Sequence, residues 1–169
     1  MATAPDGLHF GTAGVPLSSA DDSSSAGIDR VRELGLDCLE LEFVRGVHMG
    51  LDTAAKVREK AAAAGVRLSV HAPYFINLNS EDPGKRLASQ ERLLKTARVG
   101  AACGATSAVF HAAFYGKDAP EKAYAAVRSE LAAVMSIVRG ERLPIALRIE
   151  TMGKRSQFGS LDEVLSLCR

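Results

Sequence analysis

The stretch Leu94-Lys-Thr-Ala-Arg-Val-Gly-Ala-Ala-Cys-Gly-Ala-Thr-Ser-Ala-Val-Phe-His111 contains the pattern that decides the fold. Its first part places apolar or small residues at helical spacing, and Gly104 stands where that helix would end. A glycine in this position adopts the left-handed backbone of a helix end without a steric cost. Residues 107–110 are apolar or small and include a β-branched valine, as in a buried strand. The stretch therefore predicts a helix, a short turn and a strand that ends at His111.

The same junction occurs three more times, and each time a glycine precedes an apolar run by a few residues. The other pairs are Gly35 before residues 38–44, Gly65 before residues 68–71, and Gly140 before residues 144–150. A first apolar run, residues 8–12, has no helix before it. Ser160 and Glu163 have the spacing of a capping box and predict the start of a last helix. We therefore expect strands that begin near residues 8, 38, 67, 107 and 145, each followed by a helix.

Regular alternation of strands and helices predicts an α/β domain with a parallel sheet covered by helices. Five strands fit either an open doubly wound sheet or part of a (β/α)₈ barrel. A dinucleotide-binding sheet would carry G-x-G-x-x-G after its first strand, and Gly11-Thr-Ala-Gly14 does not match that motif.

Composition excludes several classes of protein. The 21 Lys and Arg residues balance 20 Asp and Glu, so any site for a polyanion has to be local. No apolar stretch is long enough to span a membrane, and residues 1–7 have neither a basic nor an apolar leader segment. Three widely spaced cysteines do not form a disulfide framework or a thiolate zinc motif. We expect a cytoplasmic protein without membrane contact.

Ligand-type side chains stand at the carboxyl ends of three consecutive expected strands. These residues are His71, His111 and Glu150. Functional groups of parallel α/β proteins gather at that edge of the sheet, where neighbouring strands lie ~4.8 Å apart. A single histidine there is commonly structural, but two imidazoles and a carboxylate in register favour a metal site. The set is typical of catalytic Zn²⁺, with Mn²⁺ or another divalent metal as the alternative. We interpret His9 and His48 as structural.

Three segments carry a resemblance to a known family. They are Val70-His-Ala-Pro-Tyr-Phe-Ile-Asn-Leu-Asn79, Val109-Phe-His-Ala-Ala-Phe-Tyr-Gly116, and Ile149-Glu-Thr-Met-Gly-Lys154 with Gln157-Phe-Gly-Ser-Leu-Asp-Glu-Val164. Together they resemble the endonuclease IV family, also called apurinic/apyrimidinic endonuclease family 2, and most closely its archaeal-type members. That family belongs to the xylose isomerase-like TIM barrels. The resemblance covers nearly the whole chain.

The resemblance implies a (β/α)₈ TIM barrel with a three-zinc cluster that cuts double-stranded DNA 5′ to an abasic site. His71 and His111 would bind one zinc ion, and Glu150 would be the catalytic ligand that bridges it to a second. Tyr74 and Phe75 would enter the duplex at the lesion, with packing at the barrel mouth as the alternative role.

Charged and polar residues of the loops after the strands add to this picture. Asn77 and Asn79 suit side-chain to backbone hydrogen bonds that orient their loop. A modest basic bias suits contacts with DNA phosphates, for which Arg45, Lys117 and Lys154 are the candidates. The charged residues counted in these loops are Arg45, Lys85, Arg86, Lys117, Lys154 and Arg155 against Glu81 and Asp118.

Two features depart from the family. Ala112-Ala113 stand where a Pro-Gly pair is usual, and a complete barrel needs ~250 residues, whereas this chain has 169. We therefore expect residues 1–169 to form one partial barrel of five βα units, without the ligands of the other two metals. Its open edges would favour self-association, and it would be a poor nuclease alone. The alternatives are a metal-dependent sugar isomerase or epimerase of the related barrels, and a non-catalytic interaction module.

Overall fold

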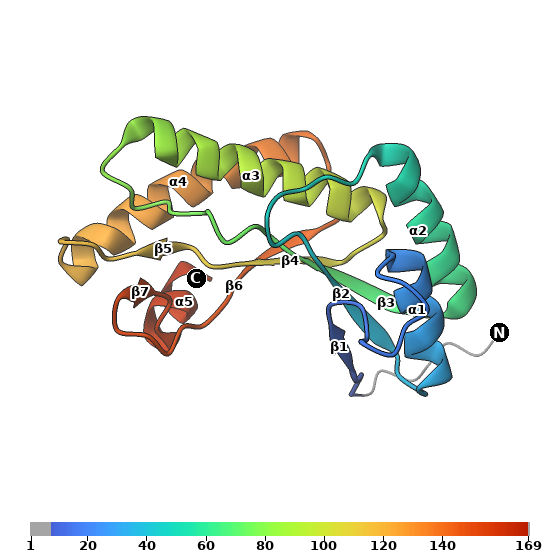
Figure 1. Ribbon diagram of the computed structural model, residues 1–169. Coiled ribbons are helices and arrows are strands. Elements are labelled where there is room, and N and C mark those ends of the chain that lie inside the picture. The colour runs from blue at the N-terminus through green and yellow to red at the C-terminus, as the bar shows by residue number, and fades with distance from the viewer. Residues whose placement is uncertain (1–7, 169) are drawn as a thin grey trace.

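The computed structural model describes residues 8–168 and contains one parallel sheet with helices along its outside (Figure 1). Residues 1–7, whose sequence underlies the expectation of a protein without a leader, lie outside the described part of the chain. The elements are β1 (Gly11–Ala13), α1 (Ser24–Glu33), β2 (Cys38–Glu42), α2 (Leu51–Ala64), β3 (Arg67–His71), α3 (Pro83–Ala102), β4 (Ser107–Phe110), β5 (Ala113–Phe114), α4 (Pro120–Gly140), β6 (Ala146–Ile149), β7 (Gln157–Phe158) and α5 (Leu161–Leu167).

The large sheet has the strand order β1-β2-β3-β4-β6, and every neighbouring pair is parallel. Helix α1 packs beside α2, α2 beside α3, and α3 beside α4, so the helices follow one another around the outside of the sheet (Figure 1). A doubly wound sheet reverses its strand order and carries helices on both faces. The sequential order and the single helical layer instead identify the structure as part of a TIM-type barrel, as the sequence predicts.

Buried apolar residues alternate with more exposed residues along the strands, so the two faces of the sheet differ. One face packs in the core under the helices, and the other is the inner face. One set of strand residues is apolar, buried and packed in the core under the helices, namely Leu39, Leu41, Leu68, Val70, Ala108 and Phe110. Because successive side chains of a strand point to opposite faces, the intervening residues, among them Glu40, Ser69 and His71, lie on the inner face. Polar groups therefore gather on the side that the helices leave uncovered.

The structure confirms most of the predicted helix starts and helix ends. Ser160 and Glu163 form the expected capping box at the start of α5. Positive φ angles confirm the predicted helix-ending glycines at Gly35, Gly65 and Gly104.

The prediction for Gly140 is wrong. Helix α4 includes this residue, and Arg142 adopts the left-handed conformation instead, with a φ of 52°. The amide of Leu143 donates to the carbonyl of Val138 at 3.1 Å, and the amide of Arg142 donates to the carbonyl of Arg139 at 3.0 Å, as in a Schellman motif. Leu143 packs against the core, and this contact sets the helix end two residues later than the glycine indicates.

Strand β1 is shorter than the apolar run at residues 8–12 predicts. It covers Gly11–Ala13, and the side chains of Leu8 and Phe10 are exposed. Its partner β2 begins at Cys38, opposite Gly11. Of the residues just before β1, Phe10 contacts this region through its carbonyl, which accepts from the amides of Asp37 and Cys38.

A second, two-stranded sheet was not predicted. Strands β5 and β7 pair antiparallel, with Ala113 opposite Phe158 and Phe114 opposite Gln157. This pair joins the loop after β4 to the loop after β6, and α5 lies beside it (Figure 1). Within residues 8–168, no helix has both the length and the apolar character needed to cross a membrane.

Candidate metal centre

The three predicted ligand residues come together at the carboxyl edge of the sheet. His71 is the last residue of β3, and His111 and Glu150 directly follow β4 and β6. Each has a donor atom within 4.8 Å of the donor atoms of the other two, and no other group of three His, Cys, Asp or Glu residues within 8–168 has this arrangement. His9 and His48 lie outside the group, as expected. The ends of three strands therefore bring these side chains together.

The three side chains converge on a single oxygen atom. Nε2 of His71 and Nε2 of His111 each lie 3.0 Å from Oε2 of Glu150. Two ligands that are each ~2.0–2.2 Å from one ion stand about 3–3.5 Å apart at the usual coordination angles. Each histidine nitrogen is thus spaced from the carboxylate oxygen as two ligands of one metal ion are, and the nitrogen and oxygen set suits Zn²⁺ or a similar divalent cation.

The contact of His71 with the backbone supports a cation at this point. Nδ1 of His71 lies 2.9 Å from the carbonyl oxygen of Ala72, which can only accept, so Nδ1 carries the hydrogen. In the neutral ring, Nε2 then directs its lone pair at a carboxylate oxygen, and two acceptors at 3.0 Å repel each other. Either a proton on Nε2 or a metal ion has to stand between them. The same carbonyl contact is the usual way in which a metal-binding histidine is oriented.

Electrostatics keep Glu150 ionised. Burial raises the pKa of this carboxyl group, but hydrogen bonds and positive charge from His71 and His111 outweigh burial and hold the pKa below its ordinary value. The Glu150 side chain is 42% exposed, against 12% for His71 and 22% for His111. The site is therefore open on the carboxylate side, where a substrate or a water molecule has room.

Tyr74 and Phe75 follow His71 closely and lie differently. The ring of Tyr74 packs against both imidazoles, with centroids 5.8 Å from His71 and 5.5 Å from His111. Phe75 is 64% exposed, and its carbonyl accepts a hydrogen bond from Arg92 of α3 at 3.2 Å. One aromatic ring thus covers the two histidines, while the other faces solvent beside them.

The candidate phosphate contacts occupy three loops on this side of the sheet. Arg45 follows β2, Lys117 follows β5, and Lys154 precedes β7, and all three side chains are exposed. Two of the basic residues that were expected in loops, Lys85 and Arg86, lie in the first turns of α3 instead. One of them, Arg86, is bound to Glu130 and to the carbonyl of Ser80, so it is not free for a phosphate.

Sequence patterns did not reveal the contacts that join the loops around the centre. Tyr115 donates from its hydroxyl to the carboxylate of Glu163, with both oxygens 2.8 Å away. The hydrogen bonds expected of Asn77 and Asn79 are present, but some of their partners lie more than thirty residues away in the chain. The capping-box spacing was the one signal that pointed to Glu163.

Comparisons with known proteins agree with this arrangement. An uncharacterized protein of Methanocaldococcus jannaschii is 41% identical over 161 residues, which cover 95% of this chain and 57% of that protein. The chain thus spans less than two thirds of this curated relative.

Solved structures include endonuclease IV from Thermus thermophilus, with a TM-score of 0.72, 18% identity, and coverage of 95% of this chain and 58% of that one. A D-tagatose 3-epimerase-like protein has a TM-score of 0.74, 19% identity, and coverage of 95% and 59%. At these identities the likeness shows the fold alone. A family model described as xylose isomerase-like TIM barrel matches residues 28–169, and this chain therefore belongs to that family.

Proposed function

We propose that this chain provides the His-His-Glu part of a divalent-metal centre in a phosphodiesterase that hydrolyses double-stranded DNA 5′ to an abasic site. The observation that carries the proposal is the convergence of His71 Nε2 and His111 Nε2 on Oε2 of Glu150. Zinc is the expected metal, since two imidazoles and a carboxylate with an open side are its catalytic ligand set.

A bound metal would supply Lewis acidity and lower the pKa of a bound water molecule to about 7. The protein's own groups would do the rest. His71, oriented by the carbonyl of Ala72, and His111 would hold the ion together with Oε2 of Glu150. The carboxylate of Glu150 is exposed and faces the side from which a substrate would approach. Phosphodiester hydrolysis of this kind uses a second metal ion at the leaving oxygen, whose ligands residues 8–168 do not bring together.

The surroundings of the centre support a DNA substrate. Phe75 is an exposed aromatic side chain beside the ligands, suited to stacking on bases next to a flipped-out nucleotide. Arg45, Lys117 and Lys154 would contact phosphates from three loops on the same side. These contacts would fix the duplex over the carboxylate.

A second candidate is a metal-dependent sugar isomerase or epimerase, and one observation favours it. The inner face below the ligands is polar: Ser69 donates to Glu40 at 2.8 Å, and Arg148 donates to Ser107 at 2.7 Å. Such groups suit the hydroxyls of a ketose. In that case Glu150 would hold the metal and a base would move a proton on the sugar.

One set of assays separates the candidates. The chain is titrated calorimetrically with Zn²⁺ and Mn²⁺, then tested with a duplex that contains one abasic site, with the intact duplex, and with a panel of ketoses. We expect one ion per chain and metal-dependent binding of the abasic duplex, with little incision because residues 8–168 bring together no ligands for a second metal ion. His111→Ala should lose both, and His48→Ala, a histidine outside the group, should keep both. Conversion of a ketose without selective DNA binding would establish the second candidate, and absence of metal binding would leave a non-catalytic interaction module.

A further inference from the structure

A buried amide side chain connects the loops that follow β3 and β4, next to the two histidines. We call residues 72–82 the His71 loop and residues 111–119 the His111 loop. Asn79 of the first loop is only 8% exposed. Its Nδ2 lies 3.1 Å from the carbonyl oxygen of Phe114, 3.2 Å from that of Tyr115 and 3.2 Å from Oδ2 of Asp118, all in the second loop. The two hydrogens of one amide group are therefore shared among three acceptors of a segment more than thirty residues away.

Neighbouring contacts extend this connection. Oδ1 of Asn77 accepts from the amide of Asn79 at 3.1 Å and from the amide of Phe114 at 3.2 Å. The amide of Leu78 donates to the carbonyl of Ala112 at 3.0 Å. The two loops are thus bound together by side-chain and backbone hydrogen bonds, although they form no strand pair with each other.

The connection begins next to the metal centre. The amide of Ala72 donates to the carbonyl of Val109 at 2.8 Å, directly beside the two histidines. The centroids of the His71 and His111 rings lie 5.3 Å apart. Residues 111–119 contain no proline that would stiffen their backbone. Beyond the strand ends, polar contacts between the loops therefore hold together the backbone next to the two imidazoles.

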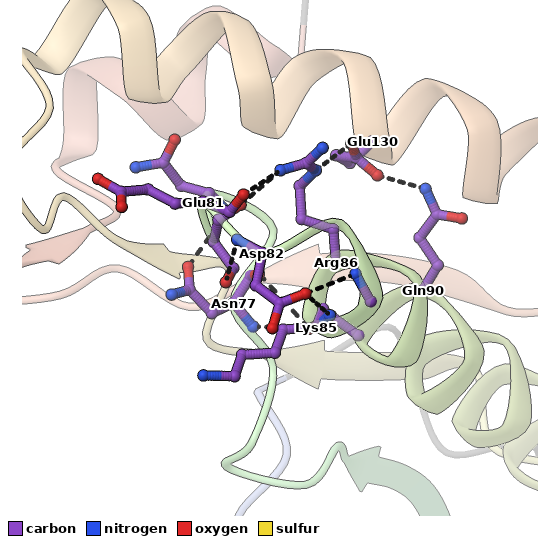
Figure 2. A network of polar contacts seen from close by, with 11 residues as sticks. Asn77, Glu81, Asp82, Lys85, Arg86, Gln90 and Glu130 are labelled. Carbon is purple, nitrogen blue, oxygen red and sulfur yellow. Dashed lines mark hydrogen bonds and ion pairs between the residues drawn. The ribbon is translucent and has the colours of Figure 1, made fainter.

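The other side of the His71 loop is fastened to helices and does not involve His111. Figure 2 shows Arg86 between the end of this loop and Glu130 of α4, with Gln90 donating to the same carboxylate. The buried hydroxyl of Ser89 accepts from the amide of Asn77 at 3.0 Å and donates to the carbonyl of Lys85 at 2.8 Å. These contacts stabilise the same loop without setting its distance from the second histidine.

We propose that Asn79 is a positioning residue, which clamps the His71 loop to the His111 loop and so fixes the two imidazoles for one metal ion. The inference rests on the metal centre proposed above. Asn79 touches no ligand, so it acts through the backbone of both loops. Because the three acceptors facing its Nδ2 accept only, position 79 needs a donor that reaches them.

The decisive variant is Asn79→Asp, which keeps the shape and replaces the donors with a carboxylate facing two carbonyls and Asp118. Ser89→Ala is the matched control, because it removes a buried anchor of the same loop on its helical side. Asn79→Ala removes the donors without adding a negative charge and should give a smaller change in the same direction, which covers the case that Asn79→Asp does not fold. Each protein is measured for Zn²⁺ affinity, for the visible spectrum of bound Co²⁺, and for amide hydrogen exchange without metal.

We expect Asn79→Asp to weaken Zn²⁺ binding about tenfold or more, in the range typical of groups that orient ligands indirectly. Its Co²⁺ spectrum should change, and amides of residues 112–115 should exchange faster. Ser89→Ala should lower the melting temperature but keep the wild-type spectrum. Wild-type affinity and spectrum in the folded Asn79 variants would overturn the proposal. A wild-type protein that binds no metal would refute the proposed function instead, and equal exchange of residues 112–115 in all variants would then refute the clamp as well.

Discussion

Nε2 of His71 and Oε2 of Glu150 meet at 3.0 Å although their strands, β3 and β6, are not neighbours in the sheet. Strand β4 lies between them and supplies His111, whose Nε2 is equally close to the same oxygen. The two histidines therefore approach one carboxylate from adjacent strands. In this geometry the negative charge of Glu150 compensates any cation that the imidazoles hold.

Glu150→Gln tests that charge directly. The amide is nearly the same size but neutral, so we expect Zn²⁺ affinity to fall by at least tenfold. A ligand that binds only the folded state raises its stability, so Zn²⁺ should raise the melting temperature of the wild type more than that of Glu150→Gln. Thermal unfolding with Zn²⁺ and with a chelator measures both. Equal stabilisation of the two proteins by Zn²⁺ would show that Glu150 is not a ligand.

Mutations of Tyr74 and Phe75 should have different effects, because only Tyr74 packs against the two histidines. Phe75→Ala should weaken binding of an abasic duplex by ~1–3 kcal/mol, the usual value for stacking of one base on an aromatic ring, and leave Zn²⁺ affinity unchanged. Tyr74→Ala should reduce both. Fluorescence anisotropy with labelled duplex and calorimetry with Zn²⁺ give the two readouts. If Phe75→Ala binds the abasic duplex as the wild type does, this side chain is not a wedge.

The three exposed cations predict a salt dependence. Each of Arg45, Lys117 and Lys154 that contacts a phosphate should contribute ~0.9 to the slope of log affinity against log salt concentration. Single alanine variants should lower that slope by about this amount on any duplex, with or without the lesion. Lys60→Ala is the control, because Lys60 pairs with Asp29 on the helical side. An unchanged slope in one variant would remove that residue from the interface.

Much of the fold and the grouping of the two histidines with the glutamate could be predicted because their signals are local. Glycines at helix ends and the alternation of strands with helices along the sequence predict that His71, His111 and Glu150 lie at one edge of the sheet. This prediction needs no long-range information. The loops are different. Strands β5 and β7 have two residues each, too few for a recognisable alternation of apolar and polar side chains. The partners Phe114 and Tyr115 of Asn79 are 35 and 36 residues away in the sequence. Such contacts form only after the sheet has brought the loops together, so no local pattern marks them.

The Tyr115–Glu163 contact predicts loss of stability at both ends of the pH range. Hydrogen bonds from Tyr115, Ser160 and Gly159 outweigh burial and lower the pKa of Glu163, while burial and the Glu163 carboxylate raise the pKa of Tyr115 to about 12. The lowered pKa stabilises the fold above the ordinary value for Glu of ~4.3, and this contribution disappears as the pH falls below it. The raised pKa stabilises the fold below pH ~10 and is lost as the pH rises toward 12.

Tyr115→Phe should therefore destabilise the protein at pH 7 by about 1 kcal/mol, and the difference from the wild type should shrink in strong acid and strong base. Urea unfolding at a series of pH values measures it. A difference that stays constant with pH would show that the phenol and the carboxylate do not interact in solution.

Gly159 links the backbone of the last loop to the metal centre. Its φ is 132°, and an added Cβ would lie 2.9 Å from the carbonyl oxygen of Glu150. The Gly159 carbonyl also accepts from the amide of Met152 at 2.8 Å, which closes the loop around the ligand. Gly159→Ala should cost about 1–3 kcal/mol of stability and displace the Glu150 backbone, so that Zn²⁺ affinity falls as well.

Gly153→Ala is the matched change in the same loop, because no atom lies within 4 Å of its added Cβ and its φ is not positive. It should leave both stability and Zn²⁺ affinity near those of the wild type. Chemical unfolding and calorimetry on the two variants compare a strained and an unstrained substitution at similar distance from Glu150. If Gly159→Ala loses stability but binds Zn²⁺ normally, the position of Glu150 is set by β6 alone and the loop after it has no part in holding the ligand.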